Sequence, residues 1–156
     1  DSVCRVGYKC VRRDVMEPKW MLLPMLAQVI LTATIMQLAR MRRLKAVKAN
    51  QVSGTYFKTM EGDPPPRFVL QSDQLVLNFF ETPVLFFAAA LAAMTLNLVD
   101  PVLLGLAWAF VAGRAWHAQI KLTHNKLGPR ALVFTLTVVL IALMWIWLVA
   151  LAFMGS

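Results

Sequence analysis

The sequence predicts an all-α integral membrane protein built as a four-helix bundle, and three observations lead to that fold class. The chain has 156 residues, of which 59% are hydrophobic, and its mean hydropathy is +0.62, so it is more apolar than soluble domains usually are. It contains four stretches close to the length of about 20 apolar residues that a helix needs to cross a bilayer. Backbone exposed to lipid must satisfy its own hydrogen bonds, which favours helices.

The four predicted spans lie within one membrane domain over residues 16–156. They cover residues 21–39, about 75–98, 101 to about 120, and 131–154, and the last holds no charged residue. Residues 39–52 are expected to continue the first helix beyond the membrane. Glycines and the prolines at 64–66 then break the helix and predict an extended strap that leads to the second span.

The basic residues predict the orientation. Two connections carry eleven of them, namely Arg40, Arg42, Arg43, Lys45, Lys48, Lys58, Arg67, Arg114, Lys121, Lys126 and Arg130. The N-terminal tail carries five, namely Arg5, Lys9, Arg12, Arg13 and Lys19. The positive-inside rule therefore places both basic connections in the cytoplasm and both termini outside, and we expect a bacterial inner membrane.

The net charge of +8 is explained by contact between the cytoplasmic basic residues and anionic lipid. The sequence shows no repeated aromatic-and-basic pattern, so nucleic acid is not an expected partner. Residues 1–15 differ in composition from the rest, and we expect an added or upstream segment outside the fold. A disulfide between Cys4 and Cys10 is possible if this tail faces the outside, and the sequence leaves that pairing open.

Polar side chains form one stripe on each of the second and third spans. Gln74, Asn78 and Glu81 share a face of the second span, and Arg114, His117 and Lys121 share a face of the third. Antiparallel neighbours would bring both stripes to the cytoplasmic leaflet, where Arg130 opens the fourth span. Glu81 is the one acidic residue in an apolar span, so we expect it within ion-pair reach of Arg114.

Two interpretations of these stripes remain open from the residues alone. The first is a functional polar site. The second is a buried Glu81–Arg114 pair that only fixes helix packing. His117 and His124 lack a third ligand at suitable spacing, so no metal site is expected.

At these positions the chain resembles a known family, the membrane-associated proteins in eicosanoid and glutathione metabolism (MAPEG). The family includes microsomal glutathione transferases, the leukotriene synthase and the inducible prostaglandin synthase. The resemblance runs from about residue 74 to residue 154, and the first span agrees in position only. The matching positions are Asn78, Glu81, Pro83 and Phe86 on the second span, Arg114 and His117 on the third, and Arg130 at the start of the fourth.

The resemblance implies a homotrimer with glutathione, as co-substrate, bound between subunits near the cytoplasmic leaflet. Asn78, Glu81, Arg114 and His117 would bind the peptide, and Arg130 would act catalytically by stabilising its thiolate. Gln74, Lys121 and Lys126 are also expected among the glutathione-binding residues. Gln74 stands where the family usually has arginine, Lys121 where it often has tyrosine, and Lys126 where the prostaglandin synthase has arginine. Small side chains on the second span are also suited to close subunit contact. They are Ala88, Ala89, Ala90, Ala92 and Ala93.

Two functions from different classes follow. One is a thiol-dependent transferase or peroxidase that acts on hydrophobic electrophiles reached through the membrane. The other is a non-catalytic membrane trimer that binds lipid or a protein partner. Whether the chain turns over a substrate is a question that the sequence leaves open.

Overall fold

The computed structural model describes residues 16–154, and all regular elements in that range are helices. Their order is η1 (Pro18–Met21), α1 (Leu22–Lys48), α2 (Tyr56–Thr59), α3 (Arg67–Thr95), α4 (Pro101–Leu122) and α5 (Leu127–Met154). This confirms the all-α prediction. The expectations for residues 1–15, including a Cys4–Cys10 disulfide, lie outside the described residues.

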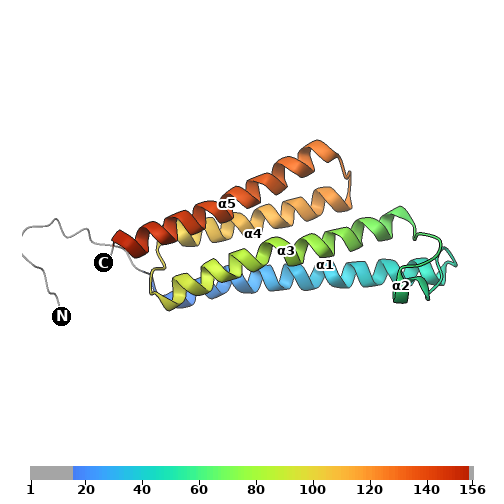
Figure 1. Cartoon of the computed structure of the whole chain (residues 1–156), viewed down its shortest axis with the longest axis horizontal. Coiled ribbons are helices and arrows are strands. Elements are labelled where there is room, and N and C mark those ends of the chain that lie inside the picture. The colour runs from blue at the N-terminus through green and yellow to red at the C-terminus, as the bar shows by residue number, and fades with distance from the viewer. Residues whose placement is uncertain (1–15, 155–156) are drawn as a thin grey trace, which may run out of the picture.

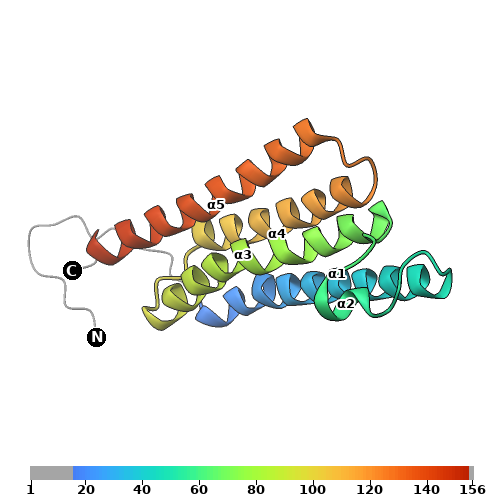
Figure 2. The same ribbon diagram turned by 45° about the vertical axis from the view of Figure 1, so that its right-hand side comes forward.

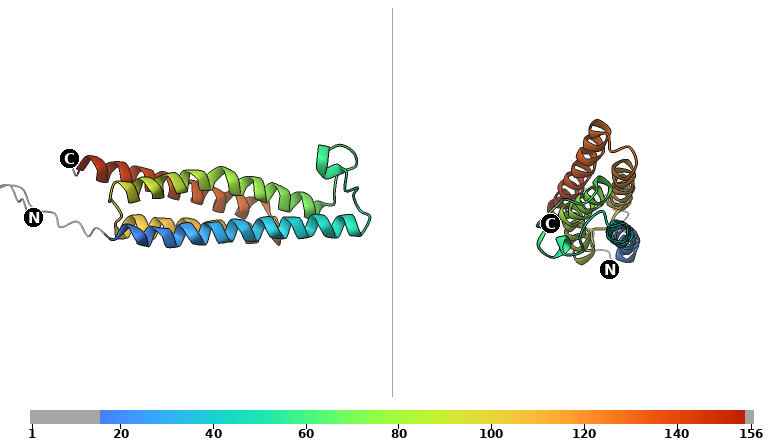
Figure 3. Two further views of the ribbon diagram at one scale, coloured as in Figure 1. Left: turned by 90° about the horizontal axis from the view of Figure 1, so that it is seen from below. Right: turned by 90° about the vertical axis from the view of Figure 1, so that its right-hand side faces the viewer.

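The four long helices lie side by side with alternating directions (Figure 1). The C-terminal end of α1, the start of α3, the end of α4 and the start of α5 gather at one end of the molecule, beside α2 (Figure 2). The views from below and along the long axis agree with this arrangement (Figure 3). Packing is most extensive between α4 and α5 and between α1 and α3. The charged ends of the predicted spans therefore share one end of the molecule.

Three helical segments are long and apolar enough to cross a membrane, namely Pro18–Lys48, Arg67–Thr95 and Leu127–Met154. Only 22%, 33% and 28% of their most apolar windows is buried within the chain, so most of this apolar surface is free to face lipid. The helix α4 does not meet the same criterion, and a fourth span remains a prediction. The continuation of the first helix beyond its apolar part is confirmed, because α1 ends at Lys48.

The main core fills the end of the molecule away from α2. There the rings of Phe86 and Phe110 stack with their centroids 4.8 Å apart. Ala89, Ala90 and Ala93 of α3 are fully buried in the same cluster. Three of the five alanines considered for subunit contact are thus already covered by the chain's own helices.

Candidate functional site

Arg114 is the largest fully buried side chain in the described part of the chain. Its Nη2 donates a hydrogen bond of 2.8 Å to the carbonyl oxygen of Asn78. Its guanidinium carbon lies 4.2 Å from the centre of the Phe79 ring, within the range of a cation–π contact. These contacts join α4 to α3, so Arg114 is oriented by two adjacent residues of the neighbouring helix.

The position of Arg114 depends on the glycine before it. A Cβ atom on Gly113 would lie 2.8 Å from Cγ2 of Thr137 on α5, so this residue lets α4 and α5 approach closely. Thr137 is fully buried and donates its hydroxyl proton to the carbonyl oxygen of Phe134, with 2.7 Å between the oxygens. The close contact of α4 with α5 brings the face that carries Arg114 and His117 against the start of α5.

Buried polar atoms without hydrogen-bond partners are concentrated at Arg114 and His117. Within residues 16–154, four buried side-chain atoms have no hydrogen-bond partner, and three of them are Nε and Nη1 of Arg114 and Nδ1 of His117. The fourth is Oε1 of Gln28. Native structures seldom leave buried polar groups unpaired, and such groups call for an explanation. A bound polar molecule would provide one.

A hollow of about 280 Å³ opens beside His117 and beside Asn78, whose carbonyl oxygen binds Arg114. Its lining residues are Asn78 from α3, His117 from α4, and Arg130, Ala131 and Phe134 from α5. The His117 and Phe134 rings lie 5.8 Å apart. Three of the residues singled out from the sequence therefore meet, and each comes from a different helix.

Arg130 is held by the turn that precedes its helix. Its Nη1 donates a hydrogen bond of 2.8 Å to Oδ1 of Asn125. Asn125 has a φ of 45°, in the left-handed region that asparagine tolerates better than most residues, and its backbone N–H bonds to the carbonyl oxygen of Ile120 at 2.8 Å. One residue thus ends α4 and anchors the guanidinium.

Sequence reasoning missed Asn125, Phe79 and Phe134. An asparagine just after a helical pattern is a recognisable turn signal, so Asn125 was detectable as the end of α4. Nothing in the sequence distinguishes Phe79 or Phe134 from the other phenylalanines of these apolar helices.

The expected ion pair between Glu81 and Arg114 is not formed within residues 16–154 of the single chain. Ion pairs within residues 16–154 join Glu17 to Lys19 and Asp73 to Arg43. Glu81 is exposed on the outer surface of α3, while Arg114 turns to Asn78 and Phe79. Spacing placed both groups at the same depth, and Glu81 still acts electrostatically on Arg114, but the charged atoms of the two side chains do not come within 4.0 Å of one another.

The remaining candidates differ in burial. Lys121 is 3% exposed and follows His117 by one helical turn on α4. Gln74 and Lys126 are exposed, and neither lines the hollow beside Arg130. A second hollow of about 370 Å³ lies between α1 and α3 and is almost wholly apolar. Phe79 lines that hollow and also contacts Arg114, so one ring separates an apolar from a polar environment.

Chemically, the polar hollow offers cationic and hydrogen-bonding groups without a paired acid. Such a set is suited to an anionic or thiol-bearing molecule, because guanidinium groups bind carboxylates and stabilise thiolates. Comparison with curated proteins and with solved structures finds no match for this chain. The model of the MAPEG family matches residues 19–150, which include all of α1, α3 and α4 and all of α5 except residues 151–154. The chain therefore belongs to the MAPEG family.

Proposed function

We propose that this protein is a membrane-embedded, glutathione-dependent transferase of the MAPEG type that acts on hydrophobic electrophiles. Membership of the family supports a membrane function in glutathione or eicosanoid metabolism. The observation that carries the proposal is the polar hollow where Asn78, His117 and Arg130 converge, together with the unpaired nitrogens of Arg114, which is bound to the Asn78 carbonyl oxygen.

In the proposed reaction, Arg130 stabilises the glutathione thiolate. A nearby guanidinium lowers a thiol's pKa and so raises the concentration of the nucleophile. The sulfur attacks an electrophilic carbon, a carbon–sulfur bond forms, and the leaving group departs with the bonding electrons. The thiol proton passes to water. Reduction of a lipid hydroperoxide would instead consume two thiols and give a disulfide.

The proposed binding residues divide by position. Arg114 offers its two free nitrogens to a carboxylate of the peptide, and Asn78 and His117 offer polar groups at the wall of the hollow. Glu81, on the outer face of α3, would meet an amine. Gln74, Lys121 and Lys126 would lie around these groups at the same end of the molecule.

The proposed assembly is a homotrimer in which each subunit, residues 16–156, forms one domain of four spans. The exposed side of α3 supports this, because Glu81 faces outward and a site between subunits would cover it. Ala88 and Ala92 are the two alanines of the α3 stripe that are not fully buried, and they permit close approach of a neighbouring helix. Both termini would lie outside and the basic end in the cytoplasm of a bacterial inner membrane.

A non-catalytic membrane trimer is the second candidate, and the packing of Arg114 favours it. A guanidinium that binds a neighbouring carbonyl and covers a phenyl ring already contributes to helix association. Gln74 in place of a basic residue also removes one cation from the proposed thiol site. In this case the protein would bind lipid or a protein partner without turnover.

The test is to measure glutathione binding by calorimetry and conjugation of glutathione with a chlorinated nitrobenzene on the same purified assembly. Conjugation forms a carbon–sulfur bond and releases chloride. Turnover with saturable binding is the expected result. Binding without turnover would reduce the proposal to a thiol-binding protein. A well-assembled protein that binds no glutathione would overturn the proposal in favour of the non-catalytic trimer.

A further inference from the structure

Three long helices of this protein are followed by an asparagine with a left-handed backbone. Asn50 follows α1, Asn97 follows α3 and Asn125 follows α4, with φ angles of 53°, 54° and 45°. Each backbone N–H donates back to a carbonyl oxygen of the preceding helix, which is a common way to end a helix. Of these three asparagines, only Asn125 has a side-chain hydrogen bond to another residue within residues 16–154, and its partner is Arg130.

The side chain of Asn125 is not needed for the turn itself. Glycine adopts a positive φ more readily than asparagine does, and it is the usual residue at this place after a helix. The amide of Asn125 instead accepts a hydrogen bond of 2.8 Å from Nη1 of Arg130, which lies in the first turn of α5. Because the backbone of Asn125 is held by its own N–H, Oδ1 presents the guanidinium with an acceptor in a fixed position.

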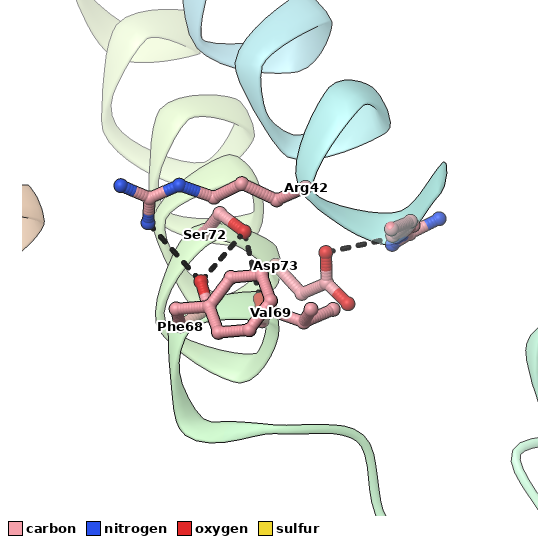
Figure 4. A network of polar contacts seen from close by, with 6 residues as sticks. Arg42, Phe68, Val69, Ser72 and Asp73 are labelled. Atoms are coloured by element: carbon pink, nitrogen blue, oxygen red, sulfur yellow. Dashed lines mark hydrogen bonds and ion pairs between the residues drawn. The ribbon is translucent and has the colours of Figure 1, made fainter. Parts of the chain in front are cut away.

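The acceptor is neutral, which distinguishes Arg130 from another arginine at the same end of the molecule. Arg43 donates to a carboxylate oxygen of Asp73 at 2.9 Å (Figure 4), so its charge is neutralised. No ion pair within residues 16–154 involves Arg130. It is close enough to His117 and Lys121 to act on both electrostatically, and neither of them is an acid. Asn125 therefore orients Arg130 and leaves its positive charge uncompensated.

Arg130 keeps unused donors beside the polar hollow. It lines that hollow together with Asn78 and His117. Its Nη1 is occupied by Asn125, while Nε and Nη2 have no hydrogen-bond partner in the described part of the chain. An arginine near a membrane surface can otherwise extend its flexible stem toward headgroups and water. A fixed acceptor therefore determines whether the guanidinium stays at the hollow.

We propose that Asn125 is the positioning residue for Arg130. Its Oδ1 holds the guanidinium at the polar hollow, and the remaining N–H donors of Arg130 meet the glutathione thiolate with their charge uncompensated. This inference rests on the proposed function, in which Arg130 stabilises the thiolate. Asn125 does not line the hollow, so it acts through Arg130. Donors that are already oriented stabilise a developing charge better than donors that must first be ordered.

The experiment compares Asn125→Gly with the matched control Asn97→Gly in the purified assembly. Both variants keep a left-handed turn, but only the first removes the acceptor for Arg130. In Asn125→Gly, conjugation of glutathione with the chlorinated nitrobenzene should slow about 10-fold, since misplacing a reacting group by about 1 Å can cost up to about 100-fold. The ultraviolet absorbance of the bound thiolate should fall as well, while glutathione binding should change by no more than about 2-fold.

A second measurement follows Arg130 itself. Phenylglyoxal modifies arginine side chains, and peptide mass spectrometry reports the rate at Arg130 with the exposed Arg67 as the internal reference. In Asn125→Gly, Arg130 should react about 5-fold faster, as expected when one hydrogen bond no longer has to break. Asn97→Gly should match wild type in this rate, in turnover and in thiolate absorbance.

Asn125→Asp separates the position of Arg130 from its charge. Aspartate keeps an oxygen acceptor and also tolerates a positive φ, so Arg130 should react with phenylglyoxal as slowly as in wild type. The carboxylate would neutralise the guanidinium, so turnover and thiolate absorbance should still fall, by about 5-fold.

Other results would overturn the inference. Wild-type turnover and thiolate absorbance in Asn125→Gly would show that Arg130 needs no positioning, and they would leave the proposed function intact. An equal loss in Asn97→Gly would assign the effect to the substitution of a turn residue in general. A wild-type protein that neither binds nor turns over glutathione would remove the proposed function and the inference with it. If Asn125→Gly does not assemble, Asn125→Asp decides, because wild-type turnover in that variant would contradict a role for the uncompensated charge.

Discussion

The two ends of α4 carry buried polar groups that differ in whether they have hydrogen-bond partners. At its start, Asp100 accepts a hydrogen bond from the backbone N–H of Leu103 at 2.7 Å and another from Nε1 of Trp147 at 2.9 Å. Toward its other end, Arg114 and His117 leave three buried nitrogens without partners. Asp100 has the pairing expected of a structural group. The unpaired nitrogens indicate that the other end is built for a molecule that the chain itself does not supply.

This difference predicts that substitutions at the Arg114 end affect function and that substitutions at the Asp100 end affect stability. Arg130→Ala should have the largest effect. Turnover in the conjugation assay should fall about 100-fold or more, comparable to the loss of one donor to a catalytic anion, because the thiolate is no longer stabilised. The ultraviolet absorbance of the bound thiolate should fall as well. Glutathione binding measured by calorimetry should change much less.

The matched control for Arg130→Ala is Arg67→Ala, which removes an exposed arginine from the same end of the molecule. Its turnover should stay close to wild type. Equal losses in the two variants would assign the effect to net charge and would contradict a specific role for Arg130.

Asp100→Ala tests the opposite end of α4. It removes the helix cap and leaves Nε1 of Trp147 without an acceptor, and the expected loss of unfolding free energy is about 2–3 kcal/mol. The measurement is denaturation in mixed micelles followed by tryptophan fluorescence and circular dichroism. Asp100→Asn keeps an oxygen acceptor and should recover much of the loss. An Asp100→Ala protein that is as stable as wild type would refute the structural role assigned to this end.

Gly113→Ala tests the close approach that positions Arg114. The new Cβ would meet Cγ2 of Thr137 at 2.8 Å, and we expect a loss of about 1–3 kcal/mol from overpacking. Gly105→Ala is the matched control on the same helix, because no atom lies within 4 Å of its new Cβ. That variant should be up to about 1 kcal/mol more stable, since alanine favours the helix. The same micelle denaturation measures both, and similar stabilities would contradict close packing at Gly113.

Glu81→Gln should have the smallest effect on stability. Glu81 is exposed and makes no ion pair within residues 16–154, so the change in unfolding free energy should stay within about 0.5 kcal/mol. Glutathione binding should weaken by about 2–5-fold if the carboxylate meets the peptide's amine near the surface. A loss of several kcal/mol of stability would instead show that Glu81 is paired within the assembled protein.

Much of the fold followed from the sequence. Continuous apolar stretches fix which segments are helices, since hydropathy and the need to satisfy backbone hydrogen bonds leave no other structure in lipid. The extension of α1 beyond its apolar part and the break at the prolines were also predicted. The start of α3 at Arg67 was not predicted. The polar run from Gln71 to Gln74 is unlike a membrane span, although it continues the helix.

What the sequence determined about the candidate site was the depth of each polar residue along its own helix. Asn78, Arg114, His117 and Arg130 were expected at one level, and they meet there. Which groups touch was decided by the tertiary structure, because the rotation and separation of neighbouring helices depend on packing contacts far apart in sequence. Gly113 against Thr137 sets the approach of α5, and Phe79 and the Asn78 carbonyl take the place beside Arg114 where Glu81 was expected.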